Sequence, residues 1–329
     1  MDKARSQTVA TLGDRFAFAH EDVALLQLID GLRERSYRFV TPTPASHARV
    51  IARPGRQMAR SLTDVLGWSL PFARELLEPD LLGPLELACA LEPAAGGLLR
   101  SRLRVSWLMD DLYLHSAYPT DAPAAVFFGP DSYRFAALIE AELSRLPLGA
   151  HAHIVDIGTG AGVGAVVAAK LAGVCTATGT DINPLALRLA AINARAAGIT
   201  LDAVRGDDLG GVGRAIDLAL ANPPYIIDDD KRQYRDGGAM HGGEVALDMA
   251  RSAIERLAPG GRLILYTGSA IVGGEDALEA ALVNAAQNVG CALHYRELDP
   301  DVFGEELARP AYQDVDRIAL VAAILTKAP

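Results

Sequence analysis

The feature that most constrains this chain is a glycine-rich segment, Val155-Asp-Ile-Gly-Thr-Gly-Ala-Gly162, which follows a short β-like run and opens a helical stretch. Glycines at such a place permit a tight turn and let a ligand lie against bare backbone. Around this segment, β-like runs alternate with helical stretches. The alternation predicts an α/β domain of the Rossmann-like, doubly wound type, with a mostly parallel sheet and helices on both faces.

The expected elements of this domain follow from hydrophobic periodicity and from helix-start signals. Helices are expected from Asp131 to Leu146, from Gly162, from Pro184 and over residues 244–257. Strands are expected at residues 154–157, 175–180, 201–204, 217–221 and 262–266. Residues 292–298 and 317–326 are two further strands joined by a loop without a helix. That connection predicts an antiparallel pair at the sheet edge, and hence a seven-stranded sheet in all.

The first 120 residues predict a smaller, helix-rich domain. Helical apolar spacing occurs over residues 20–32 and 62–77, and residues 84–91 suggest a third, shorter helix. Residues 99–105 and 112–115 then predict a β-hairpin, so the order of elements resembles a winged-helix-like docking module. Thr120-Asp-Ala-Pro-Ala-Ala is typical of a linker. We therefore divide the chain into residues 1–120 and a main domain of residues 121–329.

Charge and composition exclude several classes of protein. Half of the 329 residues are hydrophobic and 22% are charged, as in ordinary globular proteins. The net charge of −10 arises entirely after residue 120, and an acidic domain is a poor general binder of nucleic acid. Six arginines without an intervening acid are the exception, and they predict either a solvated basic face or a docking patch for RNA or an acidic partner: Arg35, Arg38, Arg49, Arg53, Arg56 and Arg60.

Location and metal content are also constrained by the residue pattern. No apolar run approaches the roughly 20 residues of a membrane span, and the chain begins Met-Asp-Lys-Ala-Arg without an apolar run behind it. We expect no membrane anchor and no signal peptide. The three cysteines lie far apart and the histidines form no metal-ligand pattern, so we expect a cytoplasmic protein without a metal.

The glycine-rich segment fits two classes of cofactor. Its second half, Gly160-Ala-Gly-Val-Gly-Ala165, satisfies the dinucleotide pattern G-x-G-x-x-A, which keeps an NAD-dependent oxidoreductase open. Asp181, at the end of the next expected strand, suits a ribose diol in either class. Asp156 favours S-adenosylmethionine (SAM), because an acid beside the turn suits a cationic sulfonium and has nothing to attract in a pyrophosphate. We expect SAM.

A second motif, Asn222-Pro-Pro-Tyr225, ends the fourth expected strand. Its two prolines remove backbone donors and leave carbonyl acceptors, and Asn222 adds a side-chain carbonyl. The side chain of Asn222 and the carbonyl of Pro223 would grip the N–H groups of a planar amino or amide nitrogen, while Tyr225 holds its plane by stacking. Such a grip would aim the nitrogen lone pair at a methyl donor, so the motif predicts N-methyl transfer without a strong general base.

The combination resembles class I SAM-dependent methyltransferases, in particular the HemK-type glutamine N5-methyltransferases that modify release factors. Gly129-Pro-Asp-Ser132 and Ala258-Pro-Gly-Gly261 resemble further segments of that family, and the resemblance covers roughly residues 126–266. Residues 1–120 and the segment around residues 299–310 show no such match. The resemblance implies a protein substrate, a release factor.

The resemblance also implies roles for individual residues. The cofactor would meet Asp156, Gly158, Gly160 and Asp181, with Asp207 or Asp208 at the adenine amino group and Asn222 facing the methyl donor. Asn222, Pro223 and Tyr225 would hold the substrate amide. The same motif serves adenine-N6 methyltransferases of RNA or DNA, so nucleic acid stays open as the alternative substrate. A non-catalytic binding module that keeps the cofactor fold is a further alternative.

Overall fold

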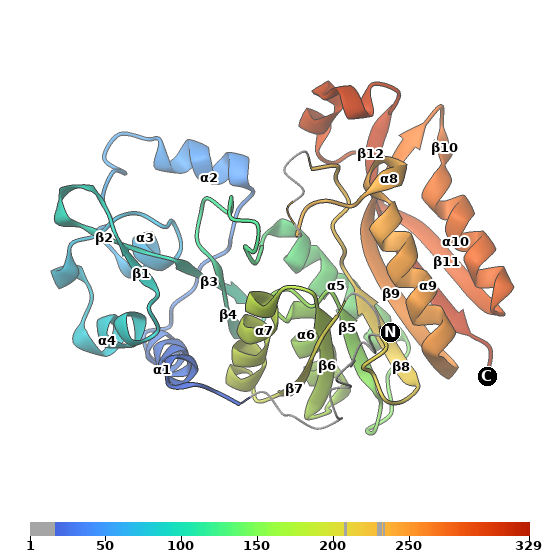
Figure 1. Cartoon of the computed structure of the whole chain (residues 1–329), viewed down its shortest axis with the longest axis horizontal. Coiled ribbons are helices and arrows are strands. Elements are labelled where there is room, and N and C mark those ends of the chain that lie inside the picture. The colour runs from blue at the N-terminus through green and yellow to red at the C-terminus, as the bar shows by residue number, and fades with distance from the viewer. Residues whose placement is uncertain (1–16, 207–208, 229–231, 233) are drawn as a thin grey trace, which may run out of the picture.

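The computed structural model describes residues 17–206, 209–228, 232 and 234–329. Its centre is one large twisted sheet with helices on both faces, and a smaller N-terminal module lies beside it (Figure 1). The strands of the sheet lie in the order β11-β12-β9-β8-β5-β6-β7, and the short strand β10 pairs with β9. The expected α/β class and the mostly parallel sheet are confirmed.

The sheet combines a parallel half with an antiparallel edge. The neighbouring strands β7, β6, β5, β8 and β9 are parallel, whereas β12 runs antiparallel to both β9 and β11. The bounds are β5 Ile154–Ile157, β6 Thr176–Asp181, β7 Thr200–Arg205, β8 Ile216–Ala221, β9 Leu257–Val272, β10 Glu275–Asp276, β11 Cys291–Asp299 and β12 Arg317–Lys327. The antiparallel edge pair predicted from the helix-free connection is therefore confirmed.

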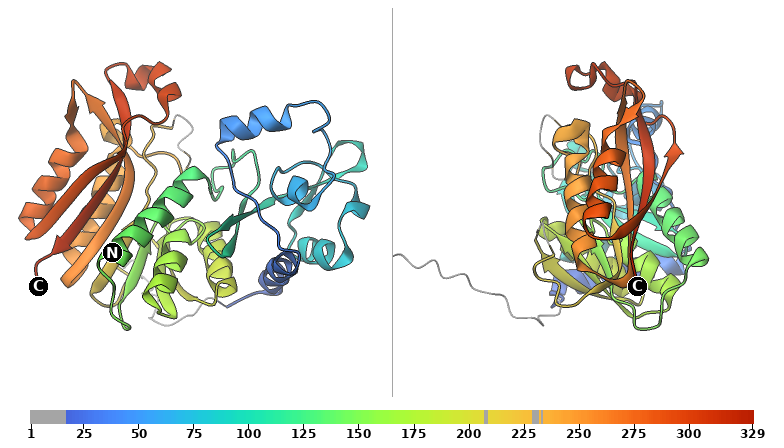
Figure 2. Two further views of the ribbon diagram at one scale, coloured as in Figure 1. Left: turned by 180° about the vertical axis from the view of Figure 1, so that it is seen from behind. Right: turned by 90° about the vertical axis from the view of Figure 1, so that its right-hand side faces the viewer.

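Two hydrophobic clusters hold the layers together. Alternate residues of the central strands point to opposite faces: Ile154 and Leu218 join the cluster under α5, α6 and α7, whereas Val155 and Ala219 join the one under α9 and α10. The side view in Figure 2 shows α9 and α10 on one side of the sheet and α5 on the other. The bounds are α5 Pro130–Arg145, α6 Val163–Ala172, α7 Pro184–Ala196, α8 Ala239–Gly242, α9 Glu244–Arg256 and α10 Ala277–Asn288.

Most expected elements of this domain occur within a few residues of their predicted bounds. Two local expectations need correction. The helix expected to start at Asp131, with this residue as its cap, starts at Pro130 instead: Gly129 is the capping residue, and the Asp131 carboxylate in the first turn accepts a hydrogen bond from the Tyr266 hydroxyl at 2.9 Å. The strand expected at residues 262–266 extends over Leu257–Val272, because both β8 and β12 pair with it.

The N-terminal module consists of short helices and two small antiparallel pairs. Its elements are α1 His20–Glu34, α2 Pro44–Ile51, α3 Leu62–Leu66, α4 Pro79–Leu87, β1 Leu91–Pro93, β2 Leu99–Ser101, β3 Leu103–Leu108 and β4 Asp111–Ser116. The helix expected over residues 62–77 was wrong in length. It ends at Leu66, where Gly67 follows and Pro71 removes a backbone donor a few residues later. The predicted hairpin is present as β3–β4, whereas β2 pairs with β1.

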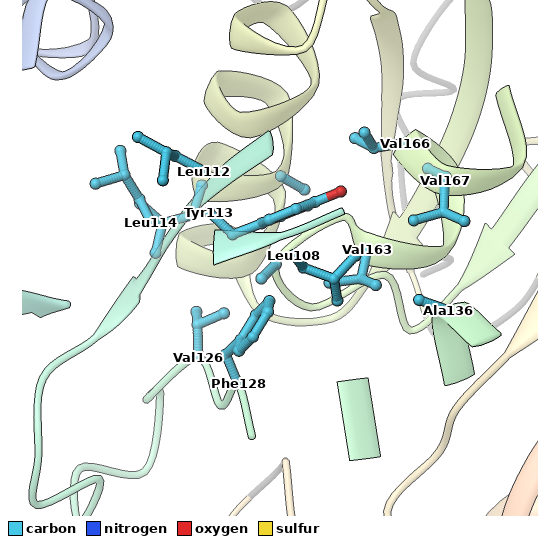
Figure 3. Close-up of a cluster of buried hydrophobic side chains, with 14 of the residues drawn as sticks. Leu108, Leu112, Tyr113, Leu114, Val126, Phe128, Ala136, Val163, Val166 and Val167 are labelled. Atoms are coloured by element: carbon cyan, nitrogen blue, oxygen red, sulfur yellow. The ribbon is translucent and has the colours of Figure 1, made fainter. Parts of the chain in front are cut away.

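The hairpin does not project into solvent but packs against the main domain. Tyr113 and Phe128 contact each other with ring centroids 5.6 Å apart, and they belong to the same buried cluster as Val163 and Val166 of α6 (Figure 3). Charged pairs flank this interface: Asp111 with Lys170 at 2.6 Å and Asp22 with Arg188 at 2.5 Å. One continuous core thus crosses residue 120, and the division into two domains there stays a prediction.

None of the described helices is long and apolar enough to cross a membrane.

Candidate active site

Two turns lie next to each other at the carboxyl ends of neighbouring parallel strands. β5 leads into the glycine turn, residues 158–162, and β8 leads into the Asn-Pro-Pro-Tyr turn, residues 222–225. The last residues of the two strands, Ile157 and Ala221, are paired. The chain goes on from β5 to β6 on one side and returns to β8 on the other, so the two turns meet at the point where the winding direction reverses. Open α/β sheets bind their ligands at such a point.

The glycine turn leaves its backbone uncovered at Gly160, whereas the Met249 side chain lies against Gly158. Gly158, Gly160 and Gly162 have φ angles of 64°, 53° and 82°, in the left-handed region that favours glycine. A methyl group added at Gly160 would meet no atom closer than 4.0 Å, whereas at Gly162 it would lie 3.1 Å from the Ala190 backbone of α7. Gly160 thus leaves room for a ligand, and Gly162 allows two elements to pack closely.

Asp156, near the end of β5, stabilises the glycine turn through hydrogen bonds. Its carboxylate is 2% exposed and accepts hydrogen bonds from the Thr159 hydroxyl at 2.7 Å and from the Ala165 amide at 3.0 Å. Burial raises the pKa of Asp156 to about 7, against the opposing effect of these two donors. These hydrogen bonds join Asp156 to the turn and to the first residues of α6, so in this structure it shapes the turn, and its direct role at the cofactor stays a prediction.

Asp181 lies at the end of β6 and links the second strand to the same turn. One carboxylate oxygen accepts a hydrogen bond from the Gly160 amide at 3.0 Å, and the other accepts one from the Asn183 amide at 2.9 Å. Desolvation raises its pKa, although these backbone donors act in the opposite direction. The structure therefore brings Asp181 and Gly160 together, and their contact with a cofactor stays a prediction.

Asn193 of α7 is a residue that the sequence reasoning missed. It is buried, and its amide group donates to the carbonyl oxygens of Ala161 and Leu114, both at 2.9 Å. Its own oxygen accepts a hydrogen bond from the Leu114 amide at 2.8 Å. One side chain thus connects the glycine turn to strand β4 of the N-terminal module. An asparagine among the buried apolar positions of a helix is the sequence signal that could have revealed it.

The Asn-Pro-Pro-Tyr turn presents Asn222 in a half-exposed position next to the glycine turn. Among the residues that the structure describes, none is hydrogen-bonded to the Asn222 carboxamide. Pro223 is buried, which fixes the backbone that carries its carbonyl. Asn222 and Pro223 therefore follow directly on the strand end that pairs with β5, and their contact with a substrate stays a prediction.

Tyr225 differs from expectation. We predicted a flat face open to the substrate, but the side chain is 8% exposed. Its ring lies so close to Gly268 of β9 that a methyl group there would be 2.4 Å from ring atom Cδ2, and Phe303 packs edge-on at 5.7 Å between centroids. Its hydroxyl lies near Asp131 without a hydrogen-bond partner among the described residues, and burial raises its pKa well above 10. In this structure Tyr225 anchors the turn, and stacking on a substrate is not supported by its burial.

Two expected contacts lie outside the described residues. These are the contacts of Asp207 and Asp208 with the adenine amino group. Within the described ranges, no group of three or more His, Cys, Asp and Glu side chains has the arrangement of a metal site.

Three of the six arginines between residues 35 and 60 contact other residues of the N-terminal module. Arg35 pairs with Glu78 and Asp80, Arg56 pairs with Asp64 at 3.0 Å, and Arg38 lies over the ring of Trp107 at 4.5 Å. Arg49, Arg53 and Arg60 are exposed. Half of the predicted basic patch therefore has partners within the module.

Comparison with known proteins identifies the family of the chain. Residues 139–290 match the family model described as "Methyltransferase small domain". A release factor glutamine methyltransferase from Moorella thermoacetica is 32% identical over 243 residues, which are 67% of this chain and 82% of that protein. The chain belongs to the release factor glutamine methyltransferase family.

Other members of the family align over a shorter stretch. The release factor glutamine methyltransferase of Cereibacter sphaeroides is 36% identical over 162 residues, 45% of this chain and 55% of that protein. In the alignments with several relatives, the chain spans about half the length of the curated protein. Among solved structures, Trm5b from Pyrococcus abyssi has a TM-score of 0.49 at 13% identity, over 73% of this chain and 62% of that one. So distant a similarity carries no conclusion about activity.

Proposed function

We propose that this methyltransferase-family protein transfers a methyl group from SAM to the side-chain amide nitrogen of a glutamine in a protein, with a release factor as the leading substrate. The observation that carries the proposal is the pairing of Ile157 with Ala221, which sets the glycine turn and the Asn-Pro-Pro-Tyr turn side by side. Membership of the family supports the choice of acceptor.

The glycine turn fits a ligand such as SAM. The bare backbone at Gly160 provides the surface, and Asp181 at the end of β6 bonds to the same turn, where it would hold a ribose diol. Asp207 and Asp208 remain candidates for the adenine end. When bound, SAM supplies an electrophilic methyl group on a sulfonium centre.

The chain's own residues supply alignment. The Asn222 side-chain oxygen and the Pro223 carbonyl accept the two N–H groups of the substrate amide, which favours a pyramidal nitrogen with its lone pair directed at the methyl carbon. SAM held at the glycine turn beside Gly160 and Asp181 would supply the methyl group to this nitrogen, with the sulfur keeping the electron pair of the bond that breaks. The extra proton on nitrogen leaves to water afterwards, so the mechanism requires orientation and electrostatic fit rather than a strong base.

The test is methyl transfer from labelled SAM to a purified bacterial release factor. We expect transfer by the native protein and a loss of at least about a hundredfold in kcat for Asn222→Ala. Asn284→Ala, at an exposed position of α10, is the matched control and should behave as native. Binding of S-adenosylhomocysteine by Asn222→Ala, measured by calorimetry, shows that the fold is intact.

Other outcomes would redirect the assignment. Label that appears in a cell extract in a nuclease-sensitive polymer would favour the adenine-N6 reaction and overturn the glutamine acceptor. Binding of NAD without binding of SAM would favour the oxidoreductase. Cofactor binding without transfer to any polymer would leave a binding module.

A further inference from the structure

Residues 300–316 connect β11 to β12. This connection lies outside the segments that resemble the methyltransferase family, yet it packs against the Asn-Pro-Pro-Tyr turn and the residues after it. It forms two short 3₁₀ turns, Gly304–Ala308 and Pro310–Tyr312. Figure 1 shows this connection at the upper end of β12, beside α8. We call it the cover segment.

The cover segment holds both backbone polar groups of Ile227, two residues after Tyr225. The Ile227 amide donates to the Tyr312 hydroxyl at 2.8 Å, and the Ile227 carbonyl accepts from Arg309 at 2.5 Å. Glu306 accepts a hydrogen bond from Arg309 at 2.6 Å. Tyr312 is 1% exposed, so its hydroxyl is fixed in place by the packing around its ring.

The cover segment also contacts Tyr225 directly. Phe303 meets the Tyr225 ring edge-on, and Gly268 lies against the same ring. The ring of Tyr225 is thus enclosed between β9 and the cover segment. Because Tyr225 and Ile227 follow Pro223 closely in a chain stiffened by two prolines, fixing them also fixes the carbonyl of Pro223.

The far end of the loop after the turn is attached as well. Arg235 pairs with Glu306, and His241 lies 3.1 Å from Asp314. The Tyr312 hydroxyl donates to the His241 carbonyl at 3.4 Å. The Tyr312 hydroxyl therefore joins the two ends of the loop that follows the Asn-Pro-Pro-Tyr turn.

We propose that Tyr312, aided by Phe303, is a positioning residue that sets the geometry of the Asn-Pro-Pro-Tyr turn for methyl transfer. This inference rests on the proposed function, because it assigns the cover segment to the same reaction. In-line transfer is sensitive to misplacement of its acceptors by an ångström or less. Loss of the hydrogen bond to Ile227 frees the turn without touching the cofactor side.

The test compares Tyr312→Phe with Tyr295→Phe. Tyr295 of β11 is the matched control. Its hydroxyl donates a hydrogen bond to Asp276 of β10 at 2.6 Å and does not contact the Asn-Pro-Pro-Tyr turn. For Tyr312→Phe we expect kcat for methylation of the release factor to fall about tenfold. We expect the Kd of S-adenosylhomocysteine to stay within about twofold. Tyr295→Phe should leave kcat within about twofold of native.

Hydrogen exchange makes the test independent of the substrate. The Ile227 amide should exchange at least about tenfold faster in Tyr312→Phe than in the native protein, and at the native rate in Tyr295→Phe. If the native protein does not methylate a release factor, the proposed function fails. The hydrogen-exchange rate of the Ile227 amide then decides alone whether Tyr312 holds the turn. Unchanged exchange at Ile227, or an equal loss of kcat in both variants, would overturn the inference.

Phe303→Leu provides a second variant that keeps an apolar side chain over Tyr225. We expect a smaller loss of kcat than in Tyr312→Phe, with unchanged cofactor affinity. A loss of cofactor affinity in either variant of the cover segment would show a general disturbance of the fold and contradict the positioning role.

Discussion

The two turns of the site differ in how they are supported. The glycine turn is held by residues of the elements that come directly before and after it in the chain: Asp156 of β5, Asp181 of β6 and Asn193 of α7 bond to it. The Asn-Pro-Pro-Tyr turn is held by distant residues, namely Gly268, Phe303 and Tyr312. The cofactor side is therefore supported by neighbouring elements of the parallel half, whereas the acceptor side depends on packing from the second half of the sheet.

This difference implies that cofactor binding and methyl transfer can be separated by mutation. Changes beneath the glycine turn should affect binding of S-adenosylhomocysteine, and changes around Tyr225 should affect turnover. The glycines that pack against each turn allow the matched experiments below.

The largest effect is expected for Gly268→Ala. The new methyl group would lie 2.4 Å from the Tyr225 ring, which is enclosed by Phe303 and has to move. We expect kcat to fall at least about a hundredfold while S-adenosylhomocysteine still binds. Labelled methyl transfer and calorimetry measure the two properties. Gly83→Ala, where the added methyl meets nothing within 4 Å, serves as control; native turnover in Gly268→Ala would refute the dependence on Tyr225.

A weaker effect on a different property is expected for Gly164→Ala. Its methyl group would lie 2.5 Å from the Asp156 carboxylate and push it away from Thr159 and Ala165. We expect the Kd of S-adenosylhomocysteine to rise about tenfold, because the turn loses its support. Calorimetry measures the change. Unaltered affinity would mean that Asp156 does not shape the cofactor turn.

The smallest effect concerns the pH dependence of stability. Burial raises the pKa of Asp156 from 3.8 to about 7, so the folded protein keeps a proton that the unfolded chain has lost. The stabilising contribution is complete below pH 3.8 and disappears as the pH rises towards about 7. Asp156→Asn removes this dependence. The free energy of unfolding in urea, compared at about pH 4.5 and about pH 7.5, should therefore fall more in the native protein than in the variant. Parallel pH profiles would contradict the raised pKa.

The sequence predicted the parts of the site that have local causes. A strand, three glycines and a helix start specify the glycine turn, and the strand ending at Ala221 places Asn222 beside it. The supports of the acceptor turn could not be predicted, because Tyr312 and Phe303 meet Tyr225 and Ile227 only through the tertiary fold. For the same reason the burial of Tyr225 was missed: an aromatic residue at a turn has no local signal that distinguishes an open face from a covered one.

The position of β12 has a consequence for the order in which the site is completed during synthesis. A chain leaves the ribosome from its amino end, so α6 and the glycine turn emerge long before Phe303, Tyr312 and β12. β12 then inserts between β9 and β11. A nascent chain halted near residue 300 would carry a formed cofactor turn beside an acceptor turn that nothing covers, and the exposed border of β9 would invite aggregation. Translation thus completes the glycine turn before the supports of the Asn-Pro-Pro-Tyr turn.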